Sequence, residues 1–119
     1  MKIGIVGSRM RNSLEDKELI KKEILELDPT LLVSGGCKKG ADKFAEELAV
    51  ELNIPIEVYL PEMKDGMSYY ERCACYYTRN RKIVKNSDLL VACMDPKRKG
   101  GTDYTVNFAK KNNVVVIII

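Results

Sequence analysis

Apolar residues follow two different periods along the 119-residue chain. Short runs of β-branched and aliphatic residues are typical of strands that are buried in a parallel sheet. Between these runs, apolar residues recur every three or four positions, as on one face of a helix. The most regular stripe comprises Ala41, Phe44, Ala45, Leu48, Ala49 and Leu52. The pattern predicts strands at residues 2–6, 31–33, 55–60, 88–93 and 114–119, and helices at about 13–27, 40–52, 69–86 and 102–112.

Strands and helices alternate over the whole chain, and this alternation predicts one α/β domain that spans residues 1–119. We expect a three-layer, Rossmann-like fold in which helices cover both faces of a five-stranded parallel sheet. With the first strand in the centre, the strand order is 3-2-1-4-5. The unbroken apolar run at 114–119 predicts a strand that is buried on both faces. Thr102 is a good N-cap for the last helix, after a loop at 95–101.

The composition, with 45% hydrophobic and 31% charged residues, is that of a globular protein with its own core. The formal net charge of +3 permits an anionic ligand but, without a clustered basic excess, argues against a nucleic-acid surface. Neither end has an apolar run long enough for a signal core or a membrane span, so we expect a cytoplasmic protein with no membrane partner. The four cysteines are then expected to be reduced packing residues. Because the chain has no histidine and no zinc-type cysteine spacing, no metal site is predicted.

Three glycine-bearing loops carry the candidate chemistry. They are Gly7-Ser8-Arg9 after the first strand, Ser34-Gly35-Gly36 after the second, and Gly100-Gly101-Thr102 before the last helix. In a parallel sheet with the first strand central, all three loops meet at one crevice, where ligands of open α/β sheets bind. Helix N-termini near Gly40 and Asp42 and at Thr102 present unpaired amides to a phosphate or carboxylate. Arg9 is available to pair with such a group.

A basic cluster, Thr78-Arg79-Asn80-Arg81, lies in the helix that precedes the fourth strand. Near the crevice, Arg79 would be a second clamp for a phosphate or carboxylate. Arg81 and Lys82 are interpreted as part of a solvated face. Neither the Walker A motif nor the dinucleotide-binding fingerprint is present after the first strand. The sequence therefore predicts a site for an anionic small molecule and no resident cofactor.

An ordered set of short motifs along the chain resembles the SLOG superfamily, and most nearly its small YspA-like branch. In chain order, these motifs are Gly7-Ser8-Arg9, Ser34-Gly35-Gly36 with Gly40-Ala41-Asp42, Arg79-Asn80, Ser87-Asp88 and Gly100-Gly101-Thr102. That superfamily includes the DNA-processing protein A family and the "lonely guy" phosphoribohydrolases. The resemblance implies a Rossmann-like sheet that binds a nucleotide or a nucleotide derivative. It implies that Gly100, Gly101 and Thr102 hold phosphate and that Gly35, Gly36 and Asp42 line the nucleoside side. Arg79 falls where the phosphoribohydrolases keep a functional arginine.

The chain departs from those hydrolases at one position. They carry a catalytic glutamate where this chain has Thr105, which cannot act as a carboxylate base. Asp103 lies two residues earlier and points elsewhere on the helix. The leading hypothesis is therefore a binding module, a sensor or carrier of nucleotides.

Two other functions compete with this hypothesis. One is an N-glycosidic hydrolase acting on nucleoside monophosphates, with Arg79 and either Asp42 or Asp103 in catalytic roles. The other, weaker alternative is single-stranded DNA binding through a basic groove with stacking aromatics. The tyrosines in question are Tyr69, Tyr70, Tyr76 and Tyr77. We expect these tyrosines instead to pack a helix or a subunit contact, which is compatible with a homodimer.

Overall fold

A single five-stranded sheet forms the centre of the molecule, and all four neighbouring strand pairs are parallel. The computed structural model describes residues 1–97 and 100–119. The strand order is β3-β2-β1-β4-β5, which confirms the predicted topology. The strands are β1 (Lys2–Gly7), β2 (Leu31–Ser34), β3 (Ile56–Val58), β4 (Leu89–Cys93) and β5 (Val115–Ile118). The helices are α1 (Leu14–Leu27), α2 (Ala41–Glu51), α3 (Tyr69–Lys85) and α4 (Gly101–Lys111).

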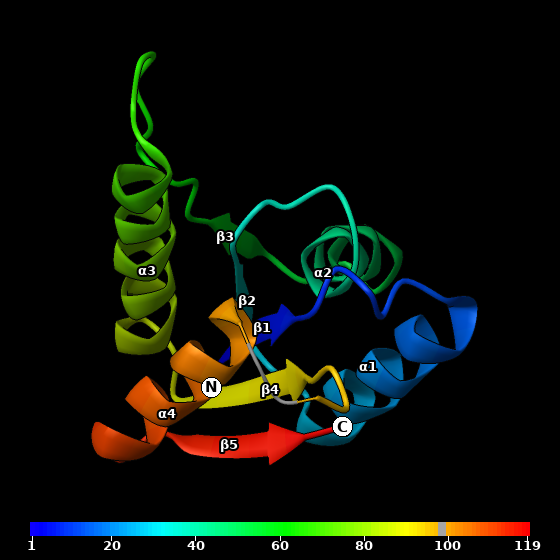
Figure 1. Ribbon diagram of the computed structural model, residues 1–119. Helices are drawn as coiled ribbons and strands as arrows, with labels where there is room; N and C mark the ends of the chain where they lie inside the picture. The colour runs from blue at the N-terminus through cyan, green and yellow to red at the C-terminus, as the bar shows by residue number, and fades with distance from the viewer. Residues whose placement is uncertain (98–99) are drawn as a thin grey trace.

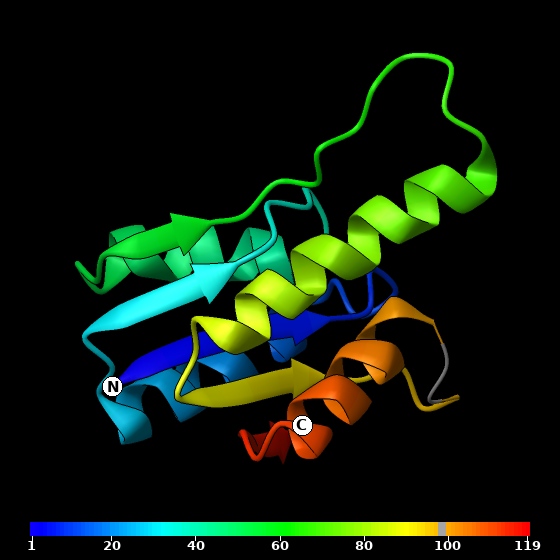
Figure 2. The ribbon, with the colours of Figure 1, turned by 90° about the vertical axis from the view of Figure 1, so that its left-hand side faces the viewer.

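The helices cover the sheet in two pairs (Figure 1). Helices α1 and α2 pack together on one face, and α3 and α4 pack together on the other. This arrangement follows from the strand order. From β1 the chain adds β2 and β3 on one side, and it then returns through α3, on the opposite face of the sheet, to add β4 and β5 on the other side of β1. The crossing leaves β1 and β4 side by side at the point where the winding reverses. Figure 2 shows that α3 runs obliquely over the sheet and that its N-terminal half extends beyond the carboxyl ends of the strands.

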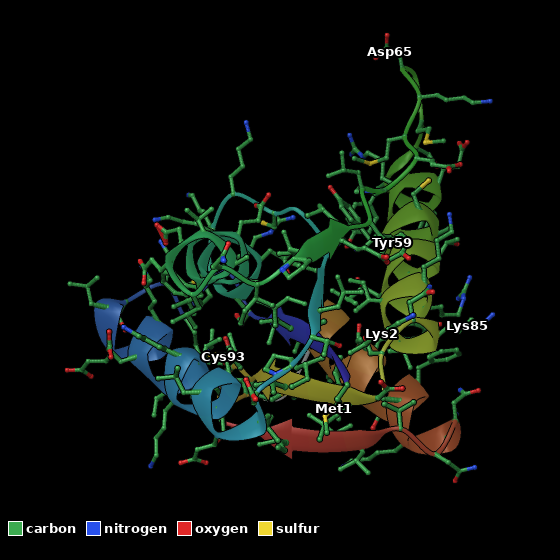
Figure 3. All side chains as sticks on the ribbon, turned by 180° about the vertical axis from the view of Figure 1, so that it is seen from behind. Met1, Lys2, Tyr59, Asp65, Lys85 and Cys93 are labelled. Atoms are coloured by element: carbon green, nitrogen blue, oxygen red, sulfur yellow. The ribbon has the colours of Figure 1, made fainter. Side chains whose placement is uncertain are left out.

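Each face of the sheet has its own apolar core. Ile3, Ile5 and Leu32 face α1 and α2, where the predicted stripe of α2 is buried from Ala41 to Ala49. Leu90 and Val33 belong to the opposite core, together with Ile83 and Val84 of α3 and Val106 of α4. Cys93 lies on the α1 side of β4 (Figure 3) and is fully buried there, as expected for a packing cysteine.

The helix ends divide into two kinds. Ser13 and Ser68 each form a capping box with an acidic residue three positions later, Asp16 and Glu71, which satisfies the first amides of α1 and α3. Helices α2 and α4 begin instead at Gly40 and Gly100, and neither N-cap makes a side-chain hydrogen bond with the described residues. Both glycines have positive φ, +72° and +90°. The prediction that Thr102 caps the last helix is therefore wrong, because the chain turns two residues earlier at Gly100 and Thr102 lies inside α4.

The predicted burial of the last strand on both faces is also wrong. β5 is an edge strand, and the Val115 side chain is 62% exposed. The third strand is shorter than predicted, and residues 59–68 form a long connection whose tip, at Asp65, projects away from the sheet (Figure 3). In the predicted loop at 95–101, residues 98 and 99 lie outside the described residues. No helix in the described ranges combines the length and the apolar character needed to cross a membrane.

Candidate functional site

A cavity of about 520 Å³ lies at the carboxyl end of β1, beside the reversal point between β1 and β4. Ligands of open α/β sheets bind at this position, and the volume is within the roughly 300–1,000 Å³ of small-molecule sites. The walls come from the β1–α1 loop, the start of α2 with its preceding loop, one side of α3 and the first turns of α4. The lining residues are Val6, Gly7, Ser8, Arg9, Met10, Cys37, Asp42, Tyr69, Cys73, Tyr76, Tyr77, Arg79, Asn80, Ile83, Gly100, Gly101, Thr102 and Thr105.

The first turn of α4 presents open backbone to the cavity. A Cβ added at Gly100 would meet nothing within 4 Å, and at Gly101 the nearest atom would be Asn80 Nδ2 at 3.7 Å. Gly101 also has an ordinary negative φ, so packing among the described residues does not require glycine there. The amides of this turn lack side-chain partners in the described chain, and the helix dipole adds positive potential. An anionic group can therefore approach the backbone closely at this point.

Thr105 lies beneath the same turn and is completely buried. Its Oγ1–H group donates a 2.7 Å hydrogen bond to the Gly101 carbonyl, within the helix. The sequence resemblance places the glutamate of the phosphoribohydrolases at this position. In this chain the Thr105 hydroxyl there is already hydrogen-bonded within the helix. Asp103 is not among the described residues of the lining, and its Oδ2 accepts a 3.4 Å hydrogen bond from Asn107.

Helix α3 supplies an aromatic wall. The α3 residues that reach the cavity lie along one side of the helix, and they are Tyr69, Cys73, Tyr76, Tyr77, Arg79, Asn80 and Ile83. The Tyr77 ring packs on the ring of Tyr104, with centroids 4.3 Å apart. The Tyr104 hydroxyl accepts a 2.8 Å hydrogen bond from Arg81 Nη1. Arg81 is thus half-buried between α3 and α4, which corrects its prediction as part of a solvated face, whereas Lys82 is exposed as expected.

The loop after β2 is occupied by the protein's own carboxylate. Asp42 Oδ1 accepts a 3.3 Å hydrogen bond from the Ser34 hydroxyl, and Oδ2 accepts a 3.0 Å bond from the Cys37 amide. Arg79 Nη1 donates to the Gly35 carbonyl at 2.5 Å, and Arg79 Nε donates to Asn80 Oδ1 at 2.8 Å. A Cβ on Gly35 would lie 2.6 Å from Arg79 Nη1, so the guanidinium fits only because this residue is glycine. This loop therefore positions Asp42 and Arg79, and both of these side chains line the cavity.

The other two glycines of this segment serve close packing. Gly36 has φ +76°, and its Cβ position would lie 2.5 Å from the Leu60 side chain. At Gly40 a Cβ would lie 2.7 Å from the Ser8 carbonyl, so α2 approaches the β1–α1 loop through bare backbone. The Gly40 amide donates a 2.8 Å hydrogen bond to Asn12 Oδ1, so a group of the protein already satisfies it.

The β1–α1 loop is held at the carboxyl end of the neighbouring strand. The Ser8 amide donates to the Cys93 carbonyl at 2.9 Å, and Ser8 Oγ accepts a 3.1 Å bond from the Met10 amide. A Cβ on Gly7 would lie 2.7 Å from the Ala41 Cβ, so glycine is required where β1 passes the start of α2. These contacts direct the loop so that Ser8 and Arg9 face the cavity.

The charges around the cavity are unequal. Burial raises the pKa of the Asp42 carboxyl, and the Cys37 amide and the Arg79 charge oppose this rise without cancelling it. The neighbouring Cys37 side chain, and after it Tyr76, raises the pKa of the Arg9 guanidinium. Arg9 therefore stays cationic, and within the described ranges it forms no salt bridge with a carboxylate.

Nine of the thirteen predicted site residues line one cavity. They are Gly7, Ser8, Arg9, Asp42, Arg79, Asn80, Gly100, Gly101 and Thr102. The other four are not among the described lining residues and lie behind the cavity wall that the loop after β2 forms. They are Ser34, Gly35, Gly36 and Gly40. Sequence reasoning missed Cys37, Cys73 and the tyrosines as cavity residues. For the residues on α3, the signal was the helical spacing of Tyr69, Cys73, Tyr76 and Asn80, four polar or amphipathic side chains on one face of the helix. The sequence carried no such signal for Cys37.

No cluster of three or more cysteine or carboxylate side chains that could hold a metal ion occurs in the described parts of the chain. No protein-family model matches the sequence, and no curated protein matches it either.

Proposed function

We propose that the protein binds a nucleotide or a nucleotide-derived small molecule in this cavity, as a sensor or carrier. One observation carries the proposal: Gly100 and Gly101 leave an uncapped helix N-terminus open toward a cavity that two guanidinium groups also line. The α4 turn, Arg9 and Arg79 would interact with phosphate oxygens. The rings of Tyr76 and Tyr77 offer flat apolar surfaces for a base.

Binding without hydrolysis agrees with the carboxyl groups of the site. Of the described residues that line the cavity, Asp42 alone carries a carboxylate, and both of its oxygens already accept hydrogen bonds from the protein. Thr105 supplies no base in the place of the hydrolase glutamate. The oxocarbenium-like transition state of N-glycosidic cleavage would therefore find no free carboxylate on these walls.

Gly101→Asp tests the proposal. An aspartate in the first turn of α4 suits the helix dipole, and its Cβ meets nothing closer than 3.7 Å, so the variant should fold normally. Its carboxylate would occupy the anion position and repel phosphate. Calorimetry with nucleotides and ADP-ribose-type compounds should show micromolar binding to the wild type and a loss of at least about 100-fold in the variant.

Gly66→Asp is the matched control. It introduces the same charge at an open glycine in the connection before α3, where an added Cβ meets nothing within 4 Å. This variant should bind as the wild type does. The proposal is wrong if no compound of the panel binds the wild type at micromolar concentration, or if Gly101→Asp binds as tightly as Gly66→Asp.

A further inference from the structure

The ring of Tyr77 is supported from behind. Tyr77 lines the cavity, whereas Tyr104, on α4, is not among the described lining residues. The two rings stack with their centroids 4.3 Å apart and 33° between their planes. Arg81 steadies the rear ring, since its Nη1 donates to the Tyr104 hydroxyl at 2.8 Å and its Nη2 donates to Thr78 Oγ1 at 3.1 Å. One face of the Tyr77 ring is thus covered by a partner whose own position is fixed.

The other two tyrosines of the described lining have different neighbours. Tyr69 is 67% exposed and meets the Tyr70 ring edge-on, with centroids 5.7 Å apart and 73° between the planes. Tyr76 has the guanidinium of Arg79 over its ring, with Cζ 5.6 Å from the centroid. A cation in that position competes with a ligand ring for the aromatic face. Of the three tyrosines, Tyr77 is therefore the one that the fold holds ready for a flat group.

The supported ring lies close to the open turn of α4. Asn80 follows Tyr77 by three residues, so both lie on neighbouring turns of the same side of α3. Asn80 Nδ2 is 3.7 Å from the position of a Cβ on Gly101. Tyr104 in turn follows Gly101 by three residues in α4. A flat group on Tyr77 is thus about one helical turn, roughly 5 Å, from the open amides, and a ribose can connect it to a phosphate there.

We infer that Tyr77 is the stacking platform for the base of the ligand and that Tyr104 is the positioning residue that holds this platform. The inference rests on the proposed function and deepens it, because it restricts the ligand to phosphates that carry a planar aromatic group. A base that stacks on an aromatic side chain gains affinity through its π-face. Because the platform is already held in place, little side-chain entropy is lost when the base binds. A sugar phosphate has no aromatic ring and gains nothing from Tyr77.

Calorimetry with AMP and with ribose 5-phosphate separates the base from the phosphate. Tyr77→Leu should weaken the binding of AMP by at least about ten-fold and change the binding of ribose 5-phosphate by less than about two-fold. Tyr70→Leu is the matched control, since it makes the same replacement in α3 at a ring that is 81% exposed and outside the described lining. It should bind both compounds as the wild type does. Leucine is a good helix former, so both variants should fold.

Tyr104→Leu tests the positioning role. The replacement removes the rear ring and leaves Tyr77 in the chain, so it should weaken AMP by about three-fold without changing the affinity for ribose 5-phosphate. Tyr104→Phe keeps the stacked ring and should restore most of the affinity for AMP. General damage to the structure would weaken both compounds together, and this result would remove Tyr104 from the inference.

The inference is wrong if Tyr77→Leu weakens AMP and ribose 5-phosphate equally, or weakens AMP no more than Tyr70→Leu does. Loss of AMP binding in Gly101→Asp but not in Tyr77→Leu would place the failure in this inference alone and leave the proposed function standing. A wild type that binds neither AMP nor any other nucleotide would overturn the proposed function and this inference together.

Discussion

Replacing Gly35 with alanine should destabilise the protein through Arg79. The new methyl carbon would lie 2.6 Å from Arg79 Nη1 and 2.9 Å from Cζ, so the guanidinium must leave the Gly35 carbonyl to which it donates at 2.5 Å. Hydrogen bonds of charged groups contribute about 1.5–3 kcal/mol. Because Gly35 has a negative φ, alanine also lowers the entropy of the unfolded chain, which offsets about 0.4–1 kcal/mol. The expected net loss is about 1–2 kcal/mol.

Urea unfolding in a double-mutant cycle isolates this effect. In an Arg79→Met background, Gly35→Ala loses its main clash and retains only the 3.0 Å approach to Asp42 Oδ2. It should then cost less than about 0.5 kcal/mol, with a coupling free energy of about 1 kcal/mol between the two sites. Gly101→Ala is the matched control, since its added Cβ is 3.7 Å from any neighbour and it should be neutral or slightly stabilising. Equal costs of Gly35→Ala in both backgrounds would refute the role of Arg79.

Two further predictions concern buried groups of the site. Burial raises the folded-state pKa of Asp42. The protonated carboxyl therefore contributes its full stabilisation below the unfolded-state pKa of about 4, and this stabilisation is lost as the pH rises through the folded-state pKa. Asp42→Asn should remove this loss, and urea titrations between about pH 3.5 and 7 should show the variant gaining on the wild type as the pH rises; parallel curves would contradict the assignment. Thr105→Val keeps the shape of the side chain but removes the 2.7 Å bond to the Gly101 carbonyl, which should lower the free energy of unfolding by about 0.5–1.5 kcal/mol. A cost near zero would mean that the hydroxyl has no structural role.

Most of the fold could be predicted because each element carries its own signal. The apolar stripe of α2 recurs at helical spacing within one short segment, so local pattern suffices to find that helix. The strand order follows from the alternation of strands and helices and from the handedness of parallel connections. The burial of β5 could not be predicted in the same way, because an apolar run looks alike in an edge strand and in a central strand.

The site was predicted less completely, since part of it depends on contacts that are distant in sequence. Gly35 and Gly36 looked like an open cradle for a ligand, but Arg79, 44 residues away, covers Gly35, and the Asp42 carboxylate takes the hydrogen bonds of the loop. Only the folded chain shows that this cradle is occupied and that the turn at Gly100 is open. The N-cap of α4 lies two residues before the predicted one, because Thr102 is a good N-cap in general, whereas Gly100 has the positive φ that the turn requires.

Helix α3 separates two tasks along its length. Its buried residues, Ile83 and Val84, lie in its last turns, where they anchor it to the sheet. Its first turns overhang the strand ends, and Tyr69 and Tyr70 there are 67% and 81% exposed. Replacements in these turns can therefore change the wall of the cavity while the anchor is left intact. A library randomised only in the overhanging turns would vary the cavity wall at little risk to folding, which makes this fold a practical scaffold for the design of binding sites.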